Sequence, residues 1–152
     1  MSQLKKGDAA PDFDLEDQNR NKVKLSDYRG KKLLVYFYPK ADTPGCTIQA
    51  CSVRDAGSEL SKSGLTVVGI SPDAPGKQKK FEEKYDLNFP LLSDIDHAVA
   101  DAYGAWGEKS MFGKKHEGII RSSILVDENG KVAETWYKVK PGETVPKAIE
   151  AV

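Results

Sequence analysis

The chain has 152 residues, of which 39% are hydrophobic and 30% are charged, a balance typical of one soluble globular domain. Lysine plus arginine and aspartate plus glutamate both number 23, so the formal net charge is zero and no global field indicates nucleic acid or an anionic membrane as a partner. Residues 1–7 have no apolar run of a signal peptide, and the longest apolar stretch, 33–38, is too short to span a bilayer, so we expect a cytoplasmic protein.

The first predicted element is an N-terminal β-hairpin. Apolar and polar residues alternate over 13–16 and again over 22–25, around the polar turn 17–21. The continuous apolar run 33–38 then predicts a central strand that is covered on both faces, and Pro39 should end it.

A helix is predicted directly after this strand and the short loop that follows it. Thr43 offers a hydroxyl for the N-cap, and Pro44 suits the first helical position. Gly64 suits the C-terminal end, so this helix should run to about Ser63.

The remaining predicted elements alternate between strands and helices. They are a strand over 66–70, a helix bearing Phe81 and Tyr85, a short strand over 89–92, a helix from about Asp96 to Tyr103, a hairpin of 123–126 and 131–137, and a last helix capped by Thr144 and carrying Val145, Ile149 and Val152. This order predicts a single α/β domain over 1–152, with a mixed central sheet flanked by helices. A loop at the carboxyl end of the central strand would lie where such folds usually place their sites.

Cys46 would lie in the first turn of the helix that begins after Thr43. Unpaired backbone N–H groups and the positive end of the helix dipole favour a thiolate there, and the thiolate is the reactive form of cysteine. A free cysteine is also commonly a small buried core residue, and that alternative fits Cys51 better than Cys46.

Cys51 follows five residues after Cys46. In an unbroken helix the two Cα atoms would be roughly 8.6 Å apart, beyond the limit of about 7 Å for a disulfide, so a bond between them would require the first turns of the helix to unwind. The CxxC spacing of a dithiol reductase is absent. Zinc is poorly supported, because only His97 and His116 could join the cysteines and neither has ligand spacing to them.

The segment 39–46 resembles the Pro-x-x-x-Thr-x-x-Cys motif of the peroxiredoxins. The second cysteine five residues later is similar to the Q-type subfamily, also called bacterioferritin comigratory protein. The resemblance covers nearly the whole chain and continues through 54–55, 67–71, 89–94, 103–109 and 118–122. Two residues depart from the family pattern: Gln49 stands where Glu is usual, and Val53 where Phe is usual.

This resemblance implies a thioredoxin-like fold and a peroxide pocket formed by Pro39, Thr43, Cys46 and Arg121, with Cys51 as the resolving cysteine. The implied roles agree with the chemistry, because fixed donors stabilise the charge that develops when a thiolate breaks an O–O bond. Arg121 offers a permanent cation with several donors. Without the resemblance, Thr43 reads as a helix cap, Pro39 as a strand stop and Arg121 as a solvated charge.

The expected function is reduction of hydrogen peroxide and organic hydroperoxides through a sulfenic acid on Cys46, followed by an intramolecular disulfide with Cys51 that thioredoxin or a similar dithiol protein reduces. No cofactor or metal is required, and a monomer is expected because both reacting cysteines lie in one chain. Two alternatives stay open: a thiol–disulfide oxidoreductase on the same fold, and a non-catalytic redox sensor that is oxidised without turning over.

Overall fold

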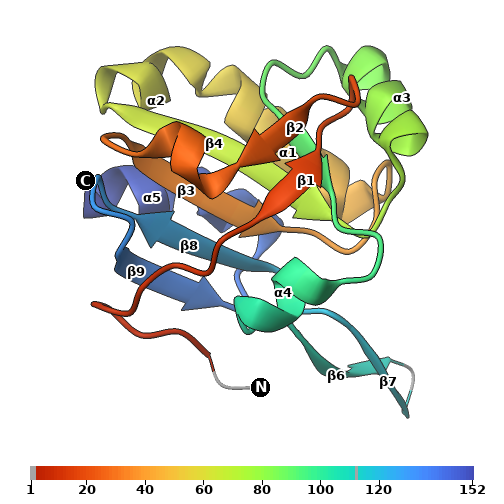
Figure 1. The fold of residues 1–152 in the computed structure, drawn as a ribbon. Coiled ribbons are helices and arrows are strands. Elements are labelled where there is room, and N and C mark those ends of the chain that lie inside the picture. The colour runs from red at the N-terminus through yellow and green to blue at the C-terminus, as the bar shows by residue number, and fades with distance from the viewer. Residues whose placement is uncertain (1–2, 112) are drawn as a thin grey trace.

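A computed structural model describes residues 3–111 and 113–152, and within them a seven-stranded mixed sheet dominates the fold (Figure 1). Its strand order is β2-β1-β5-β4-β3-β8-β9. The strands are β1 (Asp14–Glu16), β2 (Lys22–Lys24), β3 (Lys32–Phe37), β4 (Leu65–Ser71), β5 (Leu91–Ser93), β8 (Ser122–Val126) and β9 (Val132–Tyr137). The predicted mixed sheet, the N-terminal hairpin β1–β2 and the hairpin β8–β9 are all confirmed.

Strand β3 is an interior strand, parallel to β4 and antiparallel to β8. Leu33, Val35 and Phe37 enter the hydrophobic core on one face of the sheet, and Leu34 and Tyr36 enter the core on the other. All five side chains are fully buried. The apolar run therefore forms a strand covered on both faces, as predicted, although its ladder ends at Phe37, before the proline.

Helices cover both faces of the sheet. One face packs against α1 (Pro44–Asp55), α2 (Gly57–Lys62), α3 (Pro75–Tyr85) and α5 (Thr144–Ala151), and the other against α4 (Ala98–Ala102) and the 3-10 turn η1 (Leu25–Tyr28). A second 3-10 turn, η2 (Pro141–Glu143), leads into α5. Among the described residues, no helix is long and apolar enough to cross a membrane.

The predicted helix from residue 44 to residue 63 is in fact two helices. At Ala56 the backbone leaves the helical region, with ψ at 8°, and Gly57 begins α2. Gly57 and Ser58 are weak helix formers, which accounts for a break at this point. Gly64 ends α2 with a positive φ of 71°, as predicted.

Other boundaries also differ from the prediction. β5 begins only at Leu91, because Pro90 has no N–H for a ladder bond, and α4 begins at Ala98, after His97 in the left-handed region (φ 52°). Thr144 is the first residue of α5 and not its cap, and Val152 lies beyond the end of the helix.

One further hairpin was not predicted. Strands β6 (Trp106–Met111) and β7 (Lys114–Ile119) pair antiparallel and project from the rest of the domain (Figure 1). Residues 114–117 are all exposed, so β7 buries no alternating apolar face. The hairpin ends just before Arg121 and so helps to place that residue.

Candidate active site

Cys46 is the third residue of α1, which follows the loop after the carboxyl end of β3. Its side chain is only 1% exposed, and its thiol is free. The helix ladder begins where the N–H of Thr47 donates to the carbonyl of Thr43 (2.8 Å). The N–H groups of Gly45 and Cys46 therefore precede the ladder, and they provide backbone donors and the positive end of the helix beside the sulfur.

Arg121 reaches this sulfur from the neighbouring strand. It directly precedes β8, whose first residue, Ser122, pairs with Phe37 at the end of β3. Its Nη2 atom lies 3.4 Å from the Cys46 Sγ atom. A Cβ on Gly45 would lie 3.1 Å from that same Nη2, so the glycine leaves the guanidinium room to approach the sulfur. The fold thus brings together the two residues that the resemblance assigned to one pocket.

Thr43 occupies the N-cap position of α1, as predicted, but it does not cap the helix with its side chain. Its hydroxyl instead donates to the carbonyl of Lys40 (2.8 Å). Because a hydroxyl has one proton, Thr43 in this arrangement offers a lone pair to an incoming hydroxyl or peroxide, not a second donor. Pro39 lies half-buried at the start of the same loop.

Cys51 lies on the same unbroken helix as Cys46, is partly exposed and is also a free thiol. The prediction that one helix carries both cysteines is confirmed, since α1 runs unbroken from Pro44 to Asp55. Val53, the second departure from the family pattern, is buried in the same hydrophobic core as Cys46.

Gln49 is a buried polar residue at the centre of the site, and the sequence marks it only by its departure from the family pattern. Its side chain is fully buried. It accepts a hydrogen bond from Arg121 Nη1 (2.6 Å) and donates one to the Thr144 hydroxyl oxygen (2.7 Å). The signal in the sequence is its spacing of three from Cys46, which puts both residues on one helix face.

Lys109 on β6 was also missed as a neighbour of the site. Partial burial lowers the pKa of its ammonium, the nearby Arg121 lowers that pKa further, and Cys46 acts in the opposite direction. The only hint in the sequence is that Lys109 ends the segment 103–109 of the family resemblance.

The phenol of Tyr36 lies in the same core as Cys46 and is fully buried. Its oxygen has no hydrogen-bond partner among the described residues. Burial raises the pKa of Tyr36 well above the ordinary value, so this side chain stays protonated in the folded protein.

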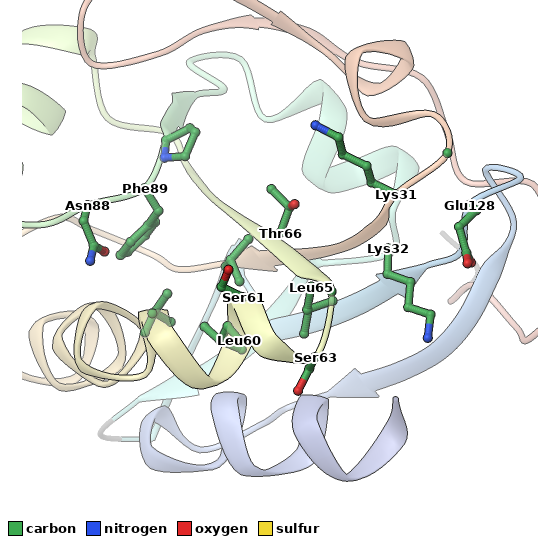
Figure 2. A pocket seen from close by; sticks show the side chains of 16 residues that line it. Lys31, Lys32, Leu60, Ser61, Ser63, Leu65, Thr66, Asn88, Phe89 and Glu128 are labelled. Atoms are coloured by element: carbon green, nitrogen blue, oxygen red, sulfur yellow. The ribbon is translucent and has the colours of Figure 1, made fainter.

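A hollow of about 770 Å³ lies elsewhere on the surface, at the opposite ends of the strands (Figure 2). Its walls include Lys32 and Leu65, the first residues of β3 and β4, together with Thr66 and Phe89. Neither cysteine lines it, whereas Cys46 follows the carboxyl end of β3. The reactive groups are therefore not gathered around this hollow.

Known proteins resemble this chain over most of its length. A model of the AhpC/TSA family matches residues 6–135. Peroxiredoxin Bcp of Escherichia coli is 55% identical over 140 residues, which cover 92% of this chain and 90% of that protein. Among solved structures, peroxiredoxin Q of Xanthomonas campestris matches with a TM-score of 0.86 at 34% identity, covering 91% of this chain and 88% of that one. A mutant PrxQ of Xylella fastidiosa matches with a TM-score of 0.91 at 28% identity, covering 99% and 96%.

Proposed function

Because this chain belongs to the AhpC/TSA family and, within it, to the Q-type peroxiredoxins, we propose that it is a thiol peroxidase whose reacting atom is the Cys46 sulfur. One observation carries the proposal: the thiol lies at the start of α1 with the Arg121 guanidinium 3.4 Å away. A cation and backbone donors around one buried sulfur can stabilise the negative charge that develops on the reacting atoms.

In the first step the Cys46 thiolate attacks one peroxide oxygen, and the O–O bond breaks. The sulfur loses two electrons and becomes a sulfenic acid, while the other oxygen leaves with the bonding pair and takes a proton to become water or an alcohol. The Arg121 guanidinium stabilises the charge that develops on these oxygens. The Thr43 hydroxyl oxygen accepts a hydrogen bond from the peroxide O–H and so orients the substrate. Pro39 shields the sulfur from bulk water.

In the second step the sulfur of Cys51 attacks the sulfenic acid sulfur. An S–S bond forms, the S–O bond breaks, and the hydroxyl group leaves as water with the proton of Cys51. The two cysteines lie in one continuous helix, so the first turns of α1 must unwind before the sulfurs can meet. A dithiol protein, for which we propose thioredoxin, then reduces the disulfide by exchange.

The substrates we propose are hydrogen peroxide and organic hydroperoxides. A related structure, the bacterioferritin comigratory protein of Xanthomonas campestris, is 33% identical over 91% of this chain and is described in terms of alkyl peroxide reduction. Residues 1–152 would act as one domain and one monomer, because the cycle needs no residue of a second chain. It would turn over in the cytoplasm, where dithiol reductants are kept reduced.

Peroxide consumption coupled to thioredoxin and its reductase tests the proposal. The wild type should turn over many equivalents of peroxide, and Cys46→Ser should turn over none while keeping its fold, because the hydroxyl is nearly the size of the thiol. A non-catalytic sensor would be oxidised once and stop, and a disulfide oxidoreductase would reduce disulfides without consuming peroxide. Turnover above background in Cys46→Ser would show that Cys46 is not the residue that attacks the peroxide.

A further inference from the structure

Three side chains, of which Gln49 and Thr144 are buried and Arg121 is partly exposed, form a continuous hydrogen-bonded line from the reactive sulfur to the C-terminal helix. Arg121 contacts the sulfur of Cys46 and donates to Gln49, and Gln49 donates to Thr144. Arginine can only donate, so the amide oxygen of Gln49 must face Arg121 and its amide nitrogen must face Thr144. The Thr144 hydroxyl is thereby fixed as the acceptor, and its side chain is only 1% exposed.

The C-terminal segment that carries Thr144 lies against the start of α1. The N–H of Val139 donates to the carbonyl of Arg121 (2.9 Å), and the Pro141 ring lies 3.5 Å from the position of a Cβ on Gly45. Val145 and Ala148 of α5 pack in the same hydrophobic core as Cys46. The first turns of α1 are thus held by the C-terminal segment, and the Gln49–Thr144 hydrogen bond is a polar side-chain link between α1 and α5.

This link lies between the two reacting cysteines. Gln49 is three residues after Cys46 and two before Cys51, so unwinding the helix far enough to join the sulfurs must move the backbone of Gln49. A fully buried amide that moves away leaves the Thr144 hydroxyl and the Arg121 guanidinium without this partner. Breaking the bond is therefore part of the cost of forming the disulfide.

We propose that Gln49 and Thr144 form a latch that holds the first turns of α1 folded and thereby sets how fast Cys51 resolves the oxidised Cys46. This inference rests on the proposed peroxidase function and concerns positioning residues, since neither side chain is assigned a contact with the peroxide. A tight latch prolongs the life of the sulfenic acid. A longer life exposes that acid to a second peroxide, which would convert it to the sulfinic acid while being reduced to water or an alcohol.

Thr144→Val tests the latch, because valine has nearly the shape of threonine and lacks the acceptor. Thr66→Val is the matched control, at a half-buried position of β4 beside the distant hollow (Figure 2). After one equivalent of peroxide, rapid quenching and mass spectrometry give the rates of sulfenic acid and disulfide formation. In Thr144→Val the disulfide should form about five- to tenfold faster than in the wild type, the effect of one neutral hydrogen bond. Sulfenic acid formation should stay within about twofold, and excess peroxide should produce less sulfinic acid.

A second pair of variants keeps the test decisive if Thr144→Val folds poorly. Gln49→Glu keeps acceptors for Arg121 and for the Thr144 hydroxyl and should retain slow resolution, whereas Gln49→Met has similar volume without either bond and should resolve faster. Amide exchange over residues 44–51 of the reduced protein should be faster than in the wild type in two variants, Thr144→Val and Gln49→Met. In Gln49→Glu and Thr66→Val it should stay at the wild-type rate. The latch is overturned, and the peroxidase function stands, if sulfenic acid forms on Cys46 but Thr144→Val and Gln49→Met form the disulfide and exchange amides at the rates of the Thr66→Val control. If no sulfenic acid forms on Cys46 in the wild type, the proposed function fails and the latch with it.

Discussion

Replacing Arg121 by alanine removes the guanidinium that contacts the reactive sulfur. The Nη2 to Sγ distance is 3.4 Å, and the same side chain also bonds Gln49. Without it, the Cys46 thiolate and the departing peroxide oxygen lose their nearest fixed positive charge. We therefore expect Arg121→Ala to slow the first chemical step and to leave the disulfide-forming step available.

The size of this effect follows from the separation and the exposure of the pair. Two unit charges about 4 Å apart attract by about 1 kcal/mol in bulk water and by about 4 kcal/mol with the screening typical near a protein surface. Arg121 is partly exposed, so solvent screening puts the contribution in the lower part of this range, at about 1–2.5 kcal/mol. The rate constant for oxidation of Cys46 should fall by about five- to seventyfold.

Stopped-flow oxidation with hydrogen peroxide, at several pH values, measures this rate. Arg121→Lys keeps the charge without the planar fork and should fall between the wild type and Arg121→Ala. Arg29→Ala, at an exposed position outside the site, removes the same charge from the chain and should leave the rate unchanged. An oxidation rate in Arg121→Ala within twofold of the wild type at every pH would refute the reasoning, because the charge beside the sulfur would then have no part in the reaction.

Three other substitutions give separate tests. Cys51→Ser should consume one equivalent of peroxide and then stall as the sulfenic acid or as intermolecular disulfides, which mass spectrometry identifies. Full turnover with thioredoxin would show that Cys51 is not the resolving residue. Thr43→Val should slow oxidation of Cys46 by about tenfold, because the hydrogen-bond acceptor is lost. The urea midpoint should change little, because the hydroxyl does not cap α1. A large loss of stability with an unchanged oxidation rate would show that Thr43 stabilises the helix and does not orient the substrate. Tyr36→Phe should be as stable as the wild type or more stable by about 1 kcal/mol, since the buried phenol lacks a partner among the described residues. Because burial raises the pKa of Tyr36 in the folded state, its protonation favours folding fully below the ordinary value of 10.0 and less as the pH rises above it. Denaturation between pH 9 and 11 should therefore show a shallower loss of stability in Tyr36→Phe, by up to about 1.4 kcal/mol per pH unit; equal slopes would contradict the burial argument.

Local sequence patterns were sufficient for much of the fold. The apolar run of β3 predicted a strand buried on both faces, and Thr43 with Pro44 predicted the start of α1, because both signals depend on residues within one element. The hairpin β6–β7 was missed because residues 114–117 are exposed on both sides and carry no apolar alternation. The break at Ala56 was not predicted because residues of weak helix propensity, such as Gly57 and Ser58, also occur inside longer helices.

The sequence predicted only those site residues that belong to the cysteine motif or to the family resemblance. Cys46, Thr43 and Pro39 share one loop and helix start, and Arg121 came from the family resemblance. The Gln49–Thr144 hydrogen bond joins residues 95 apart in sequence, and no local pattern could pair them. The direction of the Thr43 hydroxyl depends on the position of the Lys40 carbonyl, which the loop geometry alone determines.

The unwinding of α1 is the step on which this account depends most. Amide hydrogen exchange over residues 44–55, measured on the reduced protein and on the peroxide-oxidised protein, tests it directly. We predict strong protection of the first turns in the reduced state and loss of that protection once mass spectrometry confirms a Cys46–Cys51 disulfide. Equal protection in the two states, with that disulfide present, would contradict the account, because the two sulfurs would then have met without the helix opening.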